Sequence, residues 1–158
     1  MARRCSPCLR PPTLETIYAD RGRRIIRQID DKVFVSAQVQ PGDVAALVQQ
    51  GVTMIVNNRP DGEEPWQPLG AEIEVAATAA GMEYRSIPVI RGIGPADAEA
   101  MRDAMKQSRG NVLAFCRSGT RSALAWALAT SEDGMPREEI EQRLIGAGVD
   151  PTPIAHLL

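Results

Sequence analysis

A short apolar run and an alanine-rich segment are joined by a tight turn in the second half of the chain. Residues 111–116 read Asn-Val-Leu-Ala-Phe-Cys, a composition typical of a buried strand. Residues 122–129 are rich in Ala and Leu and predict a helix. The connection between them, Cys116-Arg-Ser-Gly-Thr-Arg121, is too short for anything but a strand-to-helix turn. The sequence therefore predicts a cysteine at the end of a buried strand, facing the N-terminus of a helix.

This placement gives Cys116 the surroundings of a nucleophile. Unpaired N–H groups and the positive end of the helix dipole favour a thiolate over a thiol and attract anions. Arg121 adds a two-pronged donor for an oxyanion, and Gly119 allows backbone angles that a side chain would forbid. The plainer interpretation is an inert buried cysteine beside a capped helix, but it leaves the glycine and the second arginine unexplained. We therefore predict a thiolate nucleophile inside a cradle for a tetrahedral anion.

The rest of the chain alternates between strand-like and helix-like segments. Strands are predicted at residues 32–38, 53–59, 83–89 and 111–116, and helices at 41–50, 70–80, 95–107, 122–129 and 137–145. This alternation predicts an α/β fold of three layers, in which a mainly parallel central sheet is flanked by helices. Pro88 predicts that its strand either lies at an edge of the sheet or ends there. Because ligands bind beyond the carboxyl ends of parallel strands, we expect the loops after Arg59, Val89 and Phe115 to converge on the functional site.

Length and composition restrict the organisation and the function class. The chain of 158 residues with 44% hydrophobic content fits one core, which we assign to a domain of residues 32–158, preceded by a partly flexible, basic and proline-rich extension of residues 1–31. A net charge of −2 and an aromatic content of 4% argue against nucleic-acid binding. The sequence has no apolar run that would span a membrane or form a signal peptide, so we expect no membrane partner and a cytoplasmic location. The oligomeric state stays open.

The cysteines predict neither a disulfide framework nor a metal site. The chain has three of them, an odd number, and in a reducing compartment they should be free thiols. Cys5 and Cys8 form a Cys-x-x-Cys pair, but two further zinc ligands are missing nearby, because the one histidine, His156, is remote in the sequence. We therefore expect no metal and no organic cofactor.

A loop dense in acids and turn residues follows the second predicted strand. Asp61 in this loop could protonate a leaving oxygen as a general acid, with Glu63 and Glu64 as further candidates, or all three could be ordinary solvated acids. Arg59 could bind the substrate or pair with these acids. Ser122 could donate a hydrogen bond to the Cys116 sulfur and cap the helix.

Four segments together carry a resemblance to a known family. The segments are Val35-Ser-Ala-Gln38, Gly51-Val-Thr-Met-Ile-Val-Asn-Asn-Arg-Pro-Asp-Gly-Glu-Glu64, Tyr84-Arg-Ser-Ile-Pro-Val89 and Val112-Leu-Ala-Phe-Cys-Arg-Ser-Gly-Thr-Arg-Ser122. Over about residues 25 to 130, the chain resembles the bacterial beta-lactamase hydrolase-like, phosphatase-like family within the cysteine-dependent phosphatases, with a similarity to atypical dual-specificity phosphatases. The resemblance implies a protein-tyrosine-phosphatase-like fold and a phosphorylated substrate, either a protein or a small molecule.

The resemblance also implies a role for each residue of the turn. Cys116 would attack phosphorus, Arg121 and the N–H groups of the loop would hold the equatorial oxygens, and Asp61 would protonate the departing oxygen. Water would then hydrolyse the phosphocysteine, with Ser122 easing the loss of the sulfur. The residues that would bind the phosphate are Arg117, Ser118, Gly119 and Thr120, with Arg59 as a further substrate contact.

Two departures from the wider phosphatase pattern leave alternatives open. Phe115 stands where those enzymes usually carry a histidine, and four residues rather than five separate Cys116 from Arg121. The shorter spacing resembles rhodanese-type sulfurtransferases, which carry sulfur on the cysteine as a persulfide. A third possibility is a non-catalytic module that binds anions or senses redox state through Cys116.

Overall fold

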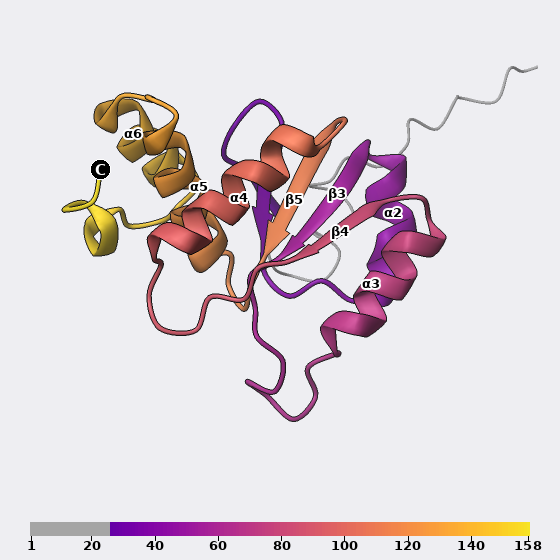
Figure 1. Ribbon diagram of the computed structural model, residues 1–158. Helices are drawn as coiled ribbons and strands as arrows, with labels where there is room; N and C mark the ends of the chain where they lie inside the picture. Colours follow the sequence, from indigo (N-terminus) through magenta and orange to yellow (C-terminus); the bar gives the residue numbers. More distant parts are fainter. Residues whose placement is uncertain (1–25) are drawn as a thin grey trace, which may run out of the picture.

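The computed structural model describes residues 26–158, and its first residues already belong to the central sheet (Figure 1). Cys5, Cys8 and most of the predicted extension lie outside the described residues. The strands are β1 (Ile26–Gln28), β2 (Val33–Ser36), β3 (Val52–Asn57), β4 (Glu83–Ser86) and β5 (Asn111–Phe115). The helices are α2 (Val44–Gln49), α3 (Gly70–Ala79), α4 (Pro95–Gln107), α5 (Thr120–Glu132) and α6 (Arg137–Gly146), with short 3-10 turns η1 (Pro41–Asp43) and η2 (Thr152–Ile154).

The five strands form one mixed sheet in the order β1-β2-β5-β3-β4. β2, β5, β3 and β4 are mutually parallel, and only β1 pairs antiparallel, with β2. The register aligns the last residues of the parallel strands in one row, which runs Ser36, Phe115, Asn57, Ser86. The loops that follow these strands therefore leave from the same edge, as the sequence predicted.

Alternation along the strands gives each face of the sheet its own core. Val112 and Ala114 of β5 pack with α4, α5 and α6 on one face, whereas Leu113 and Phe115 pack with α2 and α3 on the other. Figure 1 shows these two helical layers on either side of the sheet. Trp126 of α5 is fully buried, and its indole N–H donates to Asp30 Oδ2 at 3.3 Å. The predicted three-layer α/β architecture is confirmed.

The ends of several elements differ from the sequence prediction for local reasons. β3 ends at Asn57, because the Asn57 side-chain oxygen accepts the Arg59 N–H at 2.9 Å and turns the chain out of the sheet. β4 ends at Ser86, two residues before Pro88, and lies at the sheet edge as predicted. β1 falls inside the predicted extension, so the sheet begins before residue 32. Among residues 26–158, no helix combines the length and apolar character that crossing a bilayer requires.

Candidate active site

Cys116 is the first residue after β5, at the centre of the sheet's carboxyl edge. Its side chain is 1% exposed, and its own N–H donates to the Ser36 carbonyl of β2 at 3.3 Å. Its sulfur accepts a hydrogen bond from the Gly119 N–H at 3.1 Å. The Cys116 loop, residues 116–121, therefore folds back on the sulfur and leads directly into the first turn of α5, as the sequence predicted.

Gly119 makes this turn possible. It is the residue before α5 and has a φ of +92°, in the left-handed region that glycine adopts without strain. A Cβ at this position would lie 2.8 Å from an Arg27 guanidinium nitrogen and 3.2 Å from the Ser36 carbonyl oxygen. The position is thus closed to other residues both by its conformation and by the space around it.

Arg121 extends from the first turn of α5 towards the loops that follow β3 and β4. Its Nη1 donates to the Val89 carbonyl at 3.0 Å, which fixes the guanidinium between these loops. Both terminal nitrogens bind the Glu63 carboxylate, at 2.6 and 2.9 Å. The Glu63 carboxylate raises the pKa of Arg121, burial opposes this shift, and the Cys116 sulfur adds to it. The arginine that was predicted to hold an oxyanion therefore already holds one, supplied by the chain itself.

Arg59 organises the acidic loop, which we define as residues 58–69. It is 4% exposed, and its guanidinium donates to Gln38 at 2.8 Å, to Glu63 at 2.9 Å and to Glu64 at 2.9 Å. Of the two roles predicted for Arg59, the structure shows pairing with the acids. In this state the guanidinium is bound to these three partners. Contact of Arg59 with a substrate stays a prediction.

Glu63 is held in its ionised form. The hydrogen bonds from Arg121, helped by those from Arg59, lower its pKa from 4.5 to about 2, although burial acts in the opposite direction. At neutral pH this carboxyl has no proton to give while it stays bound to Arg121. An incoming anion that binds both terminal nitrogens of Arg121 would therefore take the place of Glu63.

Glu63 also makes a testable contribution to stability. Its lowered pKa means that the folded state gains from the ionised carboxylate fully above pH 4.5, and loses this gain as the pH falls from 4.5 towards about 2. We expect the difference in unfolding free energy between the wild type and Glu63→Gln to be constant above pH 4.5 and to shrink below it. Denaturant titrations over that range measure the difference, with Glu99→Gln on the exposed face of α4 as the control. A difference that stays constant below pH 4.5 would contradict the ion pair.

Asp61 lies near the start of the acidic loop, close to the N-terminus of α3. One carboxylate oxygen accepts the Gly70 N–H at 2.8 Å, at the N-terminus of that helix. Asp61 also lines a pocket of about 260 Å³ beside the carboxyl edge of the sheet, together with Asn57, Tyr84 and Ile90. The Tyr84 hydroxyl accepts a hydrogen bond from the Asn57 amide at 2.9 Å within this pocket. The predicted general acid thus borders a space lined by the acidic loop, α3, β4 and the loop after β4, and no residue of the Cys116 loop is part of that lining.

Ser122 differs from its predicted role. It lies inside α5, two residues after the helix begins, so it does not cap the helix; the cap position belongs to Gly119. Its hydroxyl is fully buried and has no hydrogen-bond partner among residues 26–158, so the predicted bond to the Cys116 sulfur is not made in this state. An unpaired buried hydroxyl beside the reactive loop is available to a group bound there.

The remaining loop residues lie on the solvent side. The Arg117 side chain is 67% exposed and pairs with Glu64 at 3.1 Å. The Ser118 hydroxyl lies 3.1 Å from that of Thr120.

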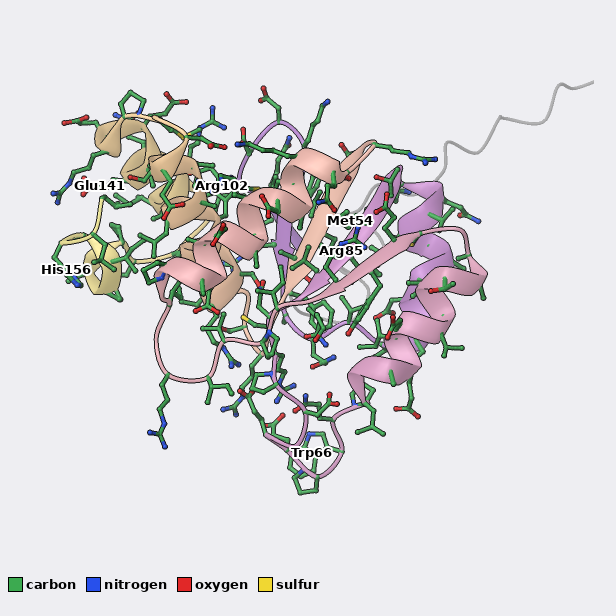
Figure 2. All side chains as sticks on the ribbon, in the orientation of Figure 1. Met54, Trp66, Arg85, Arg102, Glu141 and His156 are labelled. Carbon is green, nitrogen blue, oxygen red and sulfur yellow. The ribbon has the colours of Figure 1, made fainter. Side chains whose placement is uncertain are left out.

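Figure 2 shows Trp66 at the tip of the acidic loop, whereas His156 lies beside α6, far from that loop. Among residues 26–158, no cluster of three or more potential metal ligands occurs, and Cys116 is the one free cysteine.

Two residues that contact the loops of the site were missed by the sequence analysis. Arg27 of β1 donates to the Ser118 carbonyl at 3.0 Å, but its basic surroundings suggested an extension. The Asn58 N–H donates to the Phe115 carbonyl at 2.8 Å and its side chain to the Ile87 carbonyl at 3.0 Å, which joins the three loops. The adjacent Asn57-Asn58 pair at the end of a predicted strand is the sequence signal that could have indicated Asn58.

Comparison with known proteins identifies relatives of the region that carries this site. A family model described as "Beta-lactamase hydrolase-like protein, phosphatase-like domain" matches residues 25–132. The beta-lactamase hydrolase-like protein of Xylella fastidiosa (strain Temecula1) is 38% identical over 118 residues, which cover 73% of this chain and 27% of that protein. The chain thus spans about a quarter of the length of the curated relatives it matches.

Solved structures agree with the fold. A candidate phosphatase from Neisseria meningitidis Z2491 is 35% identical, with a TM-score of 0.72 over 82% of this chain and 93% of that one. PTPMT1 in complex with PI(5)P is 20% identical, with a TM-score of 0.62 over 82% of this chain and 89% of that one. Because PTPMT1 is only 20% identical, its likeness to this chain concerns the fold alone. That fold is the one of the protein-tyrosine-phosphatase-like proteins.

Proposed function

The chain belongs to the phosphatase-like domain family of the beta-lactamase hydrolase-like proteins, as its sequence predicted, and from this premise we propose that it is a cysteine-dependent phosphatase acting on a phosphomonoester. One observation carries the proposal. The Cys116 sulfur accepts the Gly119 N–H at the N-terminus of α5, and Arg121 follows two residues later, in the first turn of that helix. A nucleophile, N–H donors and a guanidinium fork are thereby gathered at one sheet edge.

The proposed reaction proceeds in two steps through Cys116. The thiolate attacks phosphorus, an S–P bond forms, and the P–O bond to the leaving group breaks as Asp61 supplies a proton to the departing oxygen. Water, deprotonated by Asp61, then attacks the phosphocysteine, the S–P bond breaks, and inorganic phosphate leaves. The buried hydroxyl of Ser122 donates to the departing sulfur.

Binding of the substrate requires an exchange at Arg121. In the resting site its guanidinium is paired with Glu63, so the phosphoryl group takes the place of that carboxylate. The N–H groups of residues 117–121 share the equatorial oxygens with Arg121. PTPMT1, which shares the fold, binds the phosphorylated ligand PI(5)P, and this supports a phosphorylated substrate for the present chain without defining its class.

Asp61→Asn tests the proposed acid. Because general acid catalysis contributes typically about 10² to 10⁴ in rate, we expect a loss of that order for an alkyl phosphate, whose leaving oxygen needs a proton. The loss should be much smaller for a nitrophenyl phosphate, whose leaving group departs as an anion. Steady-state rates for both esters measure this contrast, with Asp103→Asn on the exposed face of α4 as the control. An equal effect on both esters would remove Asp61 from this role.

Sulfur transfer is a second candidate, favoured by a specific observation. The loop from Cys116 to Arg121 is one residue shorter than in most cysteine phosphatases, and the acid nearest to Arg121, Glu63, is held ionised. Transfer of the sulfane sulfur of thiosulfate to the Cys116 thiolate releases sulfite, forms a persulfide and needs no acid. Passage of that sulfur to cyanide gives thiocyanate and regenerates the thiolate.

A paired assay of the purified wild type separates these functions. The phosphatase proposal predicts phosphate release from an aryl phosphate and no thiocyanate from thiosulfate and cyanide. Thiocyanate formation without phosphate release would replace it with the sulfurtransferase. If neither product forms over a panel of aryl and alkyl phosphates while phosphate still binds, the site is an anion-binding module.

A further inference from the structure

Arg27 connects three parts of the molecule that are distant in the sequence. It lies on the short strand β1, where it pairs with Val35 of β2. One terminal nitrogen donates to the Ser118 carbonyl in the Cys116 loop at 3.0 Å, and the other donates to the Ala147 carbonyl just after α6 at 2.6 Å. Arg27 is half-buried, so its guanidinium is held between the loop and the end of that helix.

The contact with Ser118 acts on the peptide group that faces the sulfur. A trans peptide is planar, so its C=O and the following N–H point in opposite directions. Arg27 binds the Ser118 carbonyl on one side of this peptide, and the Gly119 N–H therefore points to the other side, where it donates to the Cys116 sulfur at 3.1 Å. If this peptide turned over, a carbonyl oxygen would replace an N–H beside the thiolate and beside any bound anion.

The packing around Gly119 supports this arrangement independently of the hydrogen bonds. The space where a Cβ of Gly119 would stand is taken by the Arg27 guanidinium, with a separation of 2.8 Å. Gly119 has a φ of +92°, and glycine can adopt several alternative conformations at such a turn. A side chain that occupies one face of the peptide and binds its carbonyl removes that freedom.

We infer that Arg27 is a positioning residue of the active site, which fixes the Ser118–Gly119 peptide so that the Gly119 N–H faces the Cys116 sulfur. The role goes beyond the proposed function, because an oriented N–H serves phosphoryl transfer and sulfur transfer alike. It also links the C-terminal part of the chain to the site, because the Ala147 carbonyl accepts a hydrogen bond from Arg27. Ala147 lies beyond residues 25–132, which the family model matches.

The test measures the alkylation of Cys116 by iodoacetamide as a function of pH, followed on the peptide that contains this cysteine. Arg27→Met keeps the apolar part of the side chain and loses both hydrogen bonds. We expect the midpoint of its alkylation profile to move upward by about one pH unit, because a hydrogen bond to an ionised group is lost. Arg121, which interacts with the sulfur, and Glu63, which pairs with Arg121, are present in every variant.

Arg143→Met is the matched control. Arg143 of α6 also ties the region after β1 to this helix, through Asp30 at 2.8 Å, but it does not contact the Cys116 loop. A purely structural role predicts that both variants lower the melting temperature and that neither, or both, shifts the alkylation midpoint. Our inference predicts the shift for Arg27→Met alone.

Arg27→Lys keeps the test decisive if the methionine variant does not fold. Lysine retains the charge but replaces the planar fork by a single ammonium, so it cannot hold both carbonyls in the same geometry. We expect an upward shift smaller than that of Arg27→Met. An unchanged midpoint in a folded Arg27 variant, or an equal shift in Arg143→Met, overturns the inference. Because the readout is thiol alkylation, it is independent of whether the protein releases phosphate.

Discussion

Replacement of Cys116 by serine is expected to reduce phosphate release from an aryl phosphate to the rate of the uncatalysed reaction. The serine hydroxyl is far less acidic than a thiol, and the groups that contact the sulfur, the Gly119 N–H and the Arg121 guanidinium, are donors that cannot accept its proton. The N–H groups of the loop and the Arg121 guanidinium are unchanged, so the variant should still bind inorganic phosphate. Phosphate release and calorimetric phosphate binding, measured on the same preparation, check both halves of this expectation.

Measuring both phosphate release and phosphate binding separates the possible causes of a loss of activity in Cys116→Ser. Lost turnover with retained phosphate binding points to a missing nucleophile. Lost turnover together with lost binding points instead to a collapsed loop and calls for a structural check of the variant. Turnover that survives the substitution removes Cys116 from the reaction.

Arg121→Lys is expected to lower kcat/KM by about 10² to 10³, the typical cost of removing one preorganised donor from an oxyanion site. Lysine keeps the charge but presents no planar fork, so it cannot bind two oxygens of a phosphoryl group side by side. In the resting protein, both terminal nitrogens of Arg121 already hold a carboxylate in this two-point manner. Steady-state kinetics with an aryl phosphate measure the loss.

A suitable control for this substitution is Arg109→Lys. Arg109 is exposed and precedes β5, at the sheet edge opposite to the Cys116 loop. The kinetic constants of Arg109→Lys should therefore match those of the wild type. If Arg121→Lys retained wild-type kcat/KM, the charge alone would account for anion binding, and the two-point geometry seen with Glu63 would have no catalytic counterpart.

Much of the fold could be predicted because its signals are local. The 111–116 strand, the turn and the following helix are encoded within one stretch of sequence, and the helix at residues 95–107 begins at a proline and ends where the prediction placed it. β1 could not be predicted, because three residues with two polar side chains carry no periodicity. Its place in the sheet depends on pairing with β2, which is a tertiary contact.

The residues of the candidate site could be named from the sequence, and their catalytic roles stay predictions, but which acid pairs with which arginine could not be foreseen. The sequence placed Asp61 before Glu63 and Glu64 as the general acid, but it did not indicate which partner each acid would have, and the structure separates the three by their partners. Glu63 lies against Arg121, Glu64 bridges Arg59 and Arg117, and Asp61 accepts an N–H of α3. These differences arise from the direction of the acidic loop, which the buried Arg59 sets. No local pattern contains that information.

The most direct test of the account is a rapid-quench experiment that looks for phosphate on Cys116. Wild-type protein is mixed with an aryl phosphate, quenched in acid during the first turnover, digested, and examined by mass spectrometry for the peptide that contains residues 116–121. We predict a phosphoryl adduct on Cys116 that forms with the release of the aryl alcohol and decays as inorganic phosphate is released. Release of phosphate at an undiminished rate with no adduct on Cys116 at any time would contradict the account.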